Sequence, residues 1–391
     1  MLIFFLISSV FCGAAFVIIA WLHSQAQLSL RAAHVPPAAD GPLISVLVPA
    51  RNEEKNIRRC LAAILAQDYP NFQVFVLDDR STDSTPAILS ELSARDSRLV
   101  ILAGCELPPG WAGKPHALHQ AAACATGEWL LFLDADTFLH PNALSAALAS
   151  AQKSGADLYT VMTEQILASF WEKTVMPLVF TALSVGFSPR KVNDPQTRDA
   201  IANGQFIFIR RAVYDAIGGH AAIKDQIVED KALAEKVKWS GQRLVIADGR
   251  AIAQTRMYTD LASIWEGWTK NIYLGLADRP GLLLLGVFGA TLALMAALVL
   301  PAWPVVGLLW LLNGGGWMAL AVILEAGLVW GYILFERVKV NRNMGISGWY
   351  ALTTPLGAGL FAAMMLSSAW KVLSGAGVTW KGRKYKGVAK E

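Results

Sequence analysis

Four apolar runs constrain this chain most, because each is long enough to cross the roughly 30 Å hydrocarbon core of a bilayer as a helix. They cover residues 2–21, 281–300, 317–335 and 347–370, and only the third contains a charged residue, Glu325. The mean hydropathy of +0.41 agrees with a chain that lies partly in a membrane. The region between the first two runs is mixed and polar, which predicts a globular domain on a multi-pass membrane protein.

The first run is either an anchor or a signal peptide. No Lys or Arg precedes its apolar stretch, and no convincing small-x-small cleavage site follows it, which favours an uncleaved anchor. Basic residues cluster from Arg337 to Arg342 and again from Lys381 to Lys386. Both clusters favour the cytosolic side of the plasma membrane, where the globular domain is also expected.

The run 347–370 conflicts with that placement, since a single crossing would put the two basic clusters on opposite sides. It contains Pro355, Gly357 and Gly359, which are compatible with a re-entrant or interfacial hairpin. Alternatively, residues 301–312 form an additional partial span. The sequence leaves the number of spans open.

Short apolar segments alternate with helical patterns between the first two runs. The predicted strands are ISVLVP, FQVFVLDD, LVIL and WLLFLDAD, and the predicted helices cover residues 56–67, 86–96, 114–125 and 142–154. Apolar strands that are each followed by a helix predict a parallel sheet covered on both faces. Such sheets bind ligands at the carboxyl ends of their strands.

Acidic signals fall at those strand ends: PARNEE follows the first strand, DDRSTDS the second and DAD the fourth. One acidic turn is usually a solvated loop, but three at one sheet edge favour a binding site. Asp134 and Asp136 of DAD can both face a hard divalent cation, Mg²⁺ or Mn²⁺. Such an ion neutralises the charge that builds on a leaving diphosphate.

Other residues near these ends suit a nucleotide. Asp78 and Asp79 are expected to accept hydrogen bonds from a base or ribose, with backbone donors supplied by the PARNE loop. Lys114 offers a point charge to a diphosphate, although an exposed lysine at a helix start fits equally well. No G-x-x-x-x-G-K-[ST] or G-x-G-x-x-G motif is present, which disfavours a P-loop or dinucleotide fold. Four cysteines without regular spacing favour a reduced compartment and disfavour structural zinc.

Six segments in order resemble the family 2 nucleotide-sugar glycosyltransferases over about residues 43–271: ISVLVPARNEE, VLDDRSTDST, GEWLLFLDADT, NGQFIFIRR, AIGGH and VEDKALAEKVKWSG. The resemblance implies the GT-A fold, an α/β domain with a Rossmann-like, mostly parallel sheet. GWAGKPHAL, QTRMYTDLASIWEGWTKN and VTWKGRKY resemble the membrane-anchored branch that acts on lipids, such as the carotenoid, hopanoid-associated and ceramide-type glucosyltransferases.

The resemblance also implies site residues. It places Asp78 or Asp79 on the nucleotide base and assigns the metal and the diphosphate to Asp134 and Asp136. Asp230 is implied as the catalytic base, with inversion at the sugar; an acceptor hydroxyl is a poor nucleophile until a positioned carboxylate removes its proton. Acids at a helix N-terminus are the alternative interpretation of Glu229 and Asp230. Further donor residues are Pro49, Ala50, Arg51, Glu53, Lys114 and Ala135, and further residues expected toward the acceptor are Asn203, Gly204, Gln205, Glu229, Arg256 and Tyr258.

One family pattern is altered. Processive synthases and ceramide-type enzymes carry Q/R-x-x-R-W, whereas this chain has Gln254, Thr255, Arg256, Met257 and Tyr258. The departure favours a single transfer over a growing polysaccharide. Arg256 is expected to pair with a phosphate and Tyr258 to line the acceptor entrance, or both belong to a strand end packed on the membrane-facing side.

Two segments outside the four runs predict interfacial helices, at 163–185 and 260–274. Trp380, Lys381, Arg383 and Tyr385 are expected either to cap the active site or to lie on anionic lipid. Glu325 is a candidate functional residue because a charge inside a bilayer is costly, or it faces a neighbouring helix. The histidines show no ligand spacing, and His220 is expected in a turn.

The predicted organisation is an anchor at 1–22, a GT-A domain at 43–258, an interfacial helix at 259–280, a membrane region at 281–370 and a basic tail at 371–391. The predicted function is transfer of one hexose, with UDP-glucose the implied donor, to a lipid, with the membrane as partner and no nucleic acid. The alternatives are a polyprenyl-phosphate glycosyltransferase, a processive synthase and a nucleotide-sugar-binding scaffold without catalysis.

Overall fold

The computed structural model describes residues 2–25, 41–276, 280–380 and 383–385. It separates into two compact units. The sheet unit comprises Leu28–Ile166 and Phe187–Met257, and the helical unit comprises Met1–Gln27, Leu167–Gly186 and Tyr258–Glu391. Each unit is described separately below.

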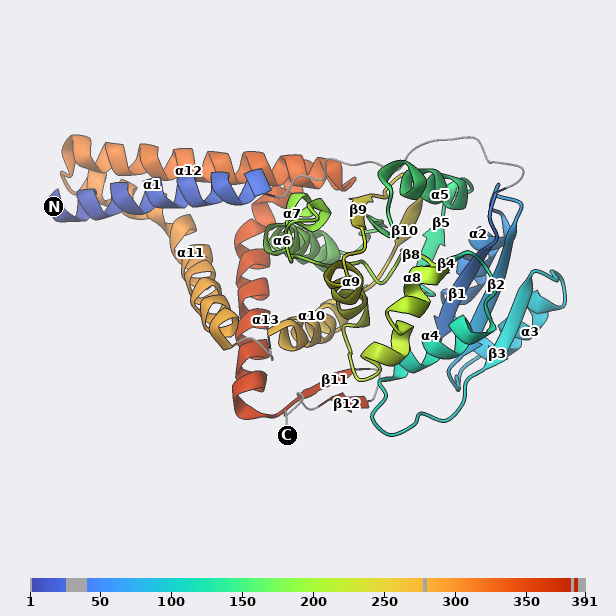
Figure 1. Cartoon of the computed structure of the whole chain (residues 1–391). Coiled ribbons are helices and arrows are strands. Elements are labelled where there is room, and N and C mark those ends of the chain that lie inside the picture. Colours follow the sequence, from blue (N-terminus) through green and yellow to red (C-terminus); the bar gives the residue numbers. More distant parts are fainter. Residues whose placement is uncertain (1, 26–40, 277–279, 381–382, 386–391) are drawn as a thin grey trace. The chain divides into compact units, whose positions relative to one another are not determined.

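The first half of the sheet unit has the predicted alternation (Figure 1). Its elements are β1 (Ile44–Ala50), α2 (Ile57–Leu65), β2 (Phe72–Asp78), α3 (Thr85–Ser93), β3 (Leu99–Ala103), α4 (Gly113–Cys124), β4 (Trp129–Phe132), β5 (Thr137–Leu139) and α5 (Ala143–Ser154). The four predicted strands and four predicted helices are therefore confirmed. Only β5, directly after DAD, has no counterpart in the sequence prediction.

The second half of the unit is less regular. Its elements are β6 (Leu158–Met162), β7 (Glu164–Gln165), α7 (Pro189–Asn193), β8 (Ile207–Arg210), α8 (Arg211–Ala216), the 3₁₀ turn η1 (Gly219–Ile223), α9 (Glu229–Trp239), β9 (Leu244–Asp248) and β10 (Ala253–Thr255). The described strands form a seven-stranded sheet in the order β3-β2-β1-β4-β8-β6-β9. Of the strand pairs in this sheet, those made by β8 with β4 and β6 are antiparallel and the others are parallel.

The order of the strands places a crevice at one edge of the sheet. β1 pairs with β2 on one side and with β4 on the other, so the chain reverses its direction of winding between β1 and β4. In open α/β sheets, ligands bind at the carboxyl ends of the strands where such a reversal occurs. The loops after β1, β2 and β4 all leave from this edge.

Two apolar layers cover the sheet, as expected for strands buried on both faces. One face packs against α2, α3 and α5, through residues such as Leu61, Leu89 and Ala147. The other packs against α4, α7, α8 and α9, through residues such as Ala121 and Leu233. Along β1, Val46 faces the first layer and Leu47 the second, which follows the two-residue period of a strand.

A small second sheet corrects one prediction. Residues 163–185 were expected to form an interfacial helix, but Glu164 and Gln165 form β7 in the three-stranded sheet β5-β10-β7. The side chain of Gln254 on β10 donates to Glu164 at 2.7 Å, which fixes this strand in the sheet unit. The helix, α6, covers only Phe170–Gly186, and it belongs to the helical unit.

The helical unit contains most of the apolar runs. Besides α6, its elements are α1 (Leu2–Gln25), α10 (Leu261–Leu276), α11 (Pro280–Leu312), α12 (Gly316–Asn343), the 3₁₀ turn η2 (Gly348–Thr353), α13 (Thr354–Ser374), β11 (Val378–Trp380) and β12 (Arg383–Tyr385). The helix predicted at 260–274 is confirmed as α10, where Asp260 caps the N-terminus by accepting from the Ser263 amide at 2.9 Å. β11 and β12 form a hairpin, whereas Lys381 and Lys386 lie outside the described residues.

Two of the predicted spans are present in the described part as helical segments long and apolar enough to cross a membrane, Gly316–Asn343 and Gly348–Ser374. Shorter apolar helices occur at Phe5–Ala14 and Pro301–Leu312. The runs 2–21 and 281–300 include residues whose side chains lie outside the described set. Crossing by these two runs therefore stays a prediction.

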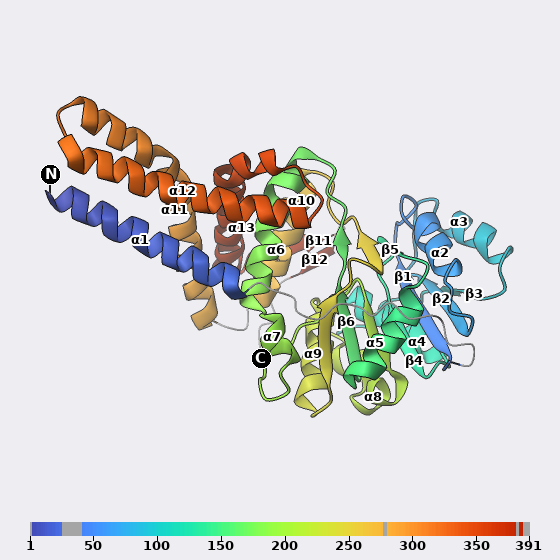
Figure 2. The ribbon, with the colours of Figure 1, turned by 90° about the horizontal axis from the view of Figure 1, so that it is seen from above.

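The structure describes both segments on which the number of spans depends, residues 301–312 and residues 347–370. Residues 301–312 continue α11, which contains Pro301 and Pro304 and changes direction along its length (Figure 2). Residues 347–370 form one helical segment, so a hairpin is wrong. Pro355 lies in the first turn of α13, where proline is tolerated, and Gly357 allows close approach, since a Cβ there would lie 2.5 Å from the Thr174 carbonyl.

Glu325 faces a neighbouring helix. Its Oε1 accepts from the Ser9 hydroxyl of α1 at 2.7 Å, and Trp303 of α11 donates to the adjacent Ser8 at 2.8 Å. These polar contacts join α1 to α12 and α11 within apolar surroundings. An unpaired carboxyl is costly there, and the bond from Ser9 lowers this cost for one of the two carboxyl oxygens of Glu325.

Arg337 stabilises an interrupted helix. Pro177 lies inside α6 and has no N–H, so the Lys173 carbonyl lacks its usual partner four residues along. Nη2 of Arg337 donates to that carbonyl at 3.0 Å and to the Thr174 carbonyl at 3.1 Å, with the side chain 4% exposed. A buried donor on α12 thus replaces a backbone donor that the sequence of α6 cannot supply.

We predict that Arg337→Met lowers the free energy of unfolding by about 2 kcal/mol, the order of a lost charge-assisted hydrogen bond. The loss should shrink when Pro177→Ala restores the missing N–H, so the cycle is non-additive. Unfolding in detergent measures each variant, with the exposed Arg342→Met on the same helix as control. An equal loss with and without Pro177→Ala would disprove the exchange of donors.

His220 is a buried core residue, in a turn as predicted. Its backbone N–H donates to the Tyr214 hydroxyl at 3.1 Å, and that hydroxyl lies 2.9 Å from Nδ1. The Tyr214 hydroxyl therefore has two partners in His220, the backbone amide and the ring. Burial, together with Lys114 and His119, lowers the pKa of His220 to about 3.

This pKa predicts acid sensitivity. Between about pH 6.5, the usual histidine value, and about pH 3, the unfolded chain binds a proton that the folded chain does not. Folding stability therefore falls as the pH drops through that window. His220→Asn keeps an acceptor near Tyr214 but does not titrate, so its melting temperature should fall less between pH 7 and pH 5. His140→Asn is the control, and an unchanged pH dependence in His220→Asn would contradict the prediction.

Candidate active site

The loops after β1 and β2 are joined by hydrogen bonds. The amide of Asn52 donates to the Ser81 hydroxyl at 2.9 Å, and the amide of Glu53 donates to the Thr85 hydroxyl at 2.8 Å. In return, the Thr82 amide donates to the Asn52 side chain at 2.8 Å. The PARNE loop was expected to offer backbone donors to a ligand, but two of them are used within the protein and hold the two loops in register.

The two aspartates after β2 have different surroundings. Asp78 accepts from the Ser81 amide at 3.0 Å, which closes the turn. Asp79 is 7% exposed and its carboxylate lies 3.3 Å from Nη1 of Arg51. Arg80 has a positive φ of 56°, a conformation that costs energy in a non-glycine residue and is common at functional sites. Asp78 is therefore the more accessible of the pair, and Arg51 orients Asp79.

Lys114 and the DAD turn meet at the end of β4. Nζ of Lys114 lies 2.6 Å from Oδ1 of Asp134, which follows β4, and 2.6 Å from Oε1 of Glu229, the first residue of α9. The three side chains come from separate segments of the chain. The sequence prediction had given Lys114 either a diphosphate contact or an exposed place at a helix start, and neither included Glu229. In this structure one ammonium group connects the predicted donor site with the helix that carries Asp230.

Asp230 is held by backbone donors. Its Oδ2 accepts from the Gly204 amide at 3.0 Å, and its Oδ1 accepts from the Lys231 amide at 2.7 Å. A Cβ at position 204 would lie 3.1 Å from both Oδ2 of Asp230 and Nζ of Lys114. Gly204 is thus the close neighbour of both charged groups, which explains the value of glycine in the NGQ segment.

The charges of this cluster alter one another. Burial raises the pKa of Asp230, and the nearby Lys114 opposes that rise. Burial likewise raises the pKa of Asp134 against the effect of Lys114. For Lys114, burial lowers the pKa, but Asp134, Glu229 and Asp230 outweigh it and leave the pKa well above the ordinary value. The lysine therefore stays charged among three carboxyl groups.

The acidic residues around DAD are of the chemical type that binds a divalent cation. Asp134 already binds a cationic group, the ammonium of Lys114. Burial raises the pKa of the Cys60 thiol, and the negative charges of Asp136, Glu53 and Asp134 raise it further. These three acids therefore lie near one another around Cys60. In the described part of the chain, no three acidic, histidine or cysteine side chains gather closely enough to hold a metal alone. Mg²⁺ is usually bound by one or two carboxylates, with water and phosphate oxygens as its other ligands. The carboxylates of Asp134 and Asp136 therefore fit such an ion.

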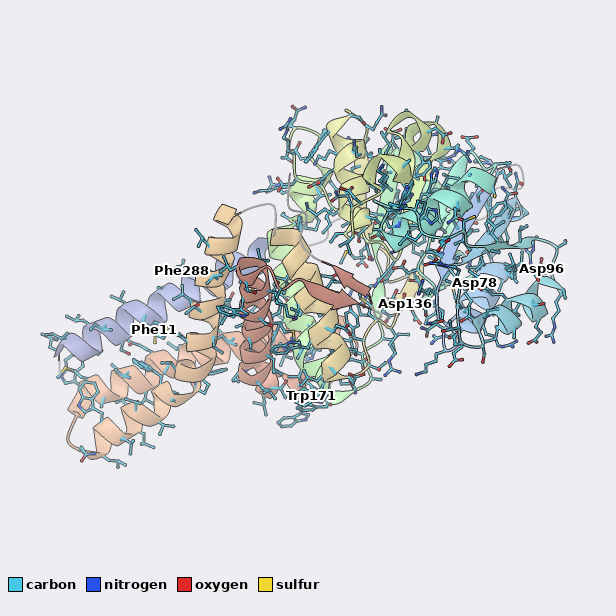
Figure 3. The ribbon with its side chains drawn as sticks, turned by 90° about the horizontal axis from the view of Figure 1, so that it is seen from below. Phe11, Asp78, Asp96, Asp136, Trp171 and Phe288 are labelled. Atoms are coloured by element: carbon cyan, nitrogen blue, oxygen red, sulfur yellow. The ribbon has the colours of Figure 1, made fainter. Side chains whose placement is uncertain are left out.

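In Figure 3, Asp136, Asp78 and Asp96 follow one another in that order across the sheet unit. Asp78 ends β2 and Asp136 follows β4, whereas Asp96 precedes β3, so the parallel strands place Asp96 at the opposite edge of the sheet. Thr255 of β10 pairs with Thr137 of β5, so the next residue, Arg256, lies at the register position beside Asp136. The placement is compatible with the predicted pairing of Arg256 with a phosphate, which stays a prediction.

Three of the predicted acceptor residues are used inside the protein. Asn203 donates to the Val161 carbonyl at 2.9 Å, and Gln205 is 5% exposed and accepts from Thr163. These two side chains hold the segment that carries Gly204. Tyr258 belongs to the helical unit, where it is buried and its ring packs against Gly267 and Trp268 of α10. This agrees with the packed alternative for Tyr258.

The sequence prediction gave no role to His116. The side chain is buried, and Asp79 acts to raise its pKa against the larger effect of burial, which lowers it. The ring of Trp111 contacts His116 and His119 at centroid distances of 5.3 and 5.1 Å. The only signal in the sequence was GWAGKPHAL, in which the aromatic residues lie within one turn of Lys114.

Comparisons with known proteins agree with this geometry. Residues 45–218 match the model of the family described as glycosyl transferase family 2. The 4,4'-diaponeurosporenoate glycosyltransferase of Staphylococcus aureus (strain MRSA252) is 28% identical over 355 residues, covering 89% of each chain. A solved structure, the mannosyltransferase PcManGT from Pyrobaculum calidifontis in complex with GDP-Man and Mn²⁺, is 18% identical, with a TM-score of 0.55, and covers 94% of this chain and 97% of that one.

These findings confirm the GT-A-like fold with its mostly parallel sheet, together with the resemblance to carotenoid-type lipid glycosyltransferases. Residues 45–218 are therefore similar to glycosyl transferase family 2, and the chain is a glycosyltransferase.

Proposed function

We propose that this glycosyltransferase moves a single hexose from a nucleoside diphosphate sugar to a lipid acceptor at the cytosolic membrane surface. The observation that carries the proposal is the meeting of Lys114, Asp134 and Asp230 beside the reversal point of the sheet. A cation for a diphosphate, a carboxylate for a metal and a carboxylate for a proton lie together there. The solved mannosyltransferase, which is similar in fold and was solved with GDP-Man and Mn²⁺, supports a nucleotide-sugar donor and a divalent cation.

The donor occupies the crevice between the ends of β1 and β4 in this proposal. Asp78 and Asp79, after β2, accept hydrogen bonds from the base or ribose, and Arg51 orients Asp79. Pro49 and Ala50 are the last residues of β1 and Glu53 lies in the loop that follows, so all three belong to the β1 end of the donor site, and Ala135 allows the backbone of DAD to approach the diphosphate. Lys114 supplies the positive charge that the diphosphate requires.

Asp134 and Asp136 hold the divalent cation. A bound Mg²⁺ or Mn²⁺ would neutralise the negative charge that develops on the leaving diphosphate. With that ion bound, Asp134 and Asp136 would be its ligands, and Lys114 would be available to contact the phosphates. The expected ion remains either of the two, since both prefer oxygen ligands.

Asp230 removes the proton from the acceptor. Its Oδ2 is fixed by the Gly204 amide, so the carboxylate is oriented before substrate arrives. Because burial raises the pKa of this group, its carboxylate accepts a proton more readily than an exposed aspartate does. Attack from the face opposite the diphosphate inverts the anomeric centre.

The acceptor is taken from the membrane. The two helical segments long enough to cross a bilayer anchor the enzyme, and the S. aureus relative supports a lipid acceptor. That relative's name specifies a carboxylate, which is already an anion and needs no base. The presence of Asp230 at the site favours a hydroxyl acceptor here, because a hydroxyl must lose a proton on transfer and a carboxylate has none to lose.

We predict that the purified protein, incubated in mixed membrane lipids with radiolabelled UDP and GDP hexoses, yields one labelled lipid. Asp230→Asn should keep donor binding and lower turnover by about 10² to 10⁴, a barrier increase of about 3 to 5 kcal/mol. Scintillation counting of the lipid extract measures the labelled product and the turnover. Unchanged turnover with Asp230→Asn would exclude Asp230 as the general base. A soluble labelled polymer would indicate a processive synthase. Donor binding without any labelled product would indicate a scaffold.

A second prediction concerns the metal. Asp136→Ala should abolish the part of nucleotide affinity that depends on Mn²⁺, while metal-independent binding of UDP or GDP remains. Calorimetry with Mn²⁺ and with EDTA measures the two parts. Asp96→Ala, an acid at the other end of the sheet, is the control. Retained Mn²⁺-dependent affinity in Asp136→Ala would remove the assignment.

A further inference from the structure

Lys114 has two carboxylate partners, and the proposed function leaves it only one of them. The distances from Nζ to Asp134 and to Glu229 are both 2.6 Å. Once Asp134 turns to a divalent cation, its oxygen is no longer available to the ammonium group, and the cation repels Lys114. Glu229 then remains as the anchor that keeps the ammonium group near the diphosphate.

The burial of Glu229 is compatible with this role as an anchor for Lys114. Its side chain is 7% exposed, whereas the Lys114 side chain is 34% exposed and the Asp134 side chain 28% exposed. The glutamate therefore lies on the protein side of the lysine, and Lys114 and Asp134 lie toward solvent. A buried carboxylate needs a partner, and Lys114 is the cation that the structure places on it.

A simpler role for Glu229 is that of an acid at a helix N-terminus, where negative charge is favourable. That role does not account for the contact with Lys114, which belongs to another helix, nor for burial of the side chain. Asp230 is the next residue and supplies a second acid to the same first turn. The helix alone thus gives no reason for a buried glutamate that points at a lysine.

We propose that Glu229 is a positioning residue: it holds Lys114 at the diphosphate when Asp134 ligates the divalent cation. This inference rests on the proposed function, because it takes the diphosphate and the cation as given. It assigns different tasks to the two neighbouring acids of the VED segment. Asp230 acts on the acceptor, and Glu229 acts on the donor through Lys114.

The shared lysine serves the site both before and after ligands bind. Without donor and metal, Lys114 neutralises Asp134, which would otherwise be a partly buried acid beside Glu229 and Asp230. With donor and metal bound, the cation takes over that neutralisation and Lys114 becomes available to the phosphates. One positive charge is therefore used twice, and Glu229 stays in contact with it in both states.

A double-mutant cycle tests the inference. The dissociation constants of UDP and GDP, with Mn²⁺ and with EDTA, are measured for wild type, Glu229→Gln, Lys114→Met and the double variant. Glu229→Gln has the same shape as the native residue and should weaken nucleotide binding by roughly tenfold. In the Lys114→Met background it should have no further effect, because the group through which it acts is gone.

Two controls distinguish a positioning role from a general loss of structure. Glu229→Asp keeps the charge at shorter reach and should bind nucleotide with an affinity between those of wild type and Glu229→Gln. Melting temperatures of all variants show whether the fold is weakened. If Glu229→Gln weakens binding equally with and without Lys114, or leaves binding unchanged, the positioning role is wrong while the proposed function stands. If wild type binds neither nucleotide, the proposed function fails and this inference with it.

Discussion

The site depends on the parallel pairing of β1 with β2 on one side and β4 on the other. Parallel strands must all end at the same edge, so segments separated by tens of residues deliver their following turns to one place. Arg51, Asp78 and Asp134 share one edge of the sheet for this reason. Everything else at the site is added to that edge: α4 brings Lys114, and α9 brings Glu229 and Asp230.

Much of this half of the fold follows from the sequence, because its signals are local. Apolar segments such as FQVFVLDD are too short and too continuous for anything but buried strands, and they are separated by helical patterns of matching length. The rule that acids at strand ends share an edge then places Asp78, Asp134 and Asp136. Resemblance to a family was needed for Asp230, since nothing near it in the sequence distinguishes a base from a helix-terminal acid.

Other features depend on contacts between distant segments and could not be predicted. Glu164 looked like an interruption in a helix, but its pairing with β10 makes it part of a strand. The bond between Lys114 and Glu229 joins residues more than a hundred positions apart, and no local pattern records it. Arg337 looked like one of several basic residues flanking a span, until Pro177 gave it a carbonyl to bind. In each case a partner far along the chain decides the role.

The hydrogen bonds between the loops after β1 and β2 have a consequence for binding. Asn52, Ser81, Thr82 and Thr85 fix these loops without help from a ligand, and two residues there hold positive φ angles. A nucleotide that enters this end of the site therefore orders little of the chain, and little conformational entropy is lost on binding. In the proposed function, the groups that change partner on binding are the side chains of Lys114 and Asp134, at the other end of the site.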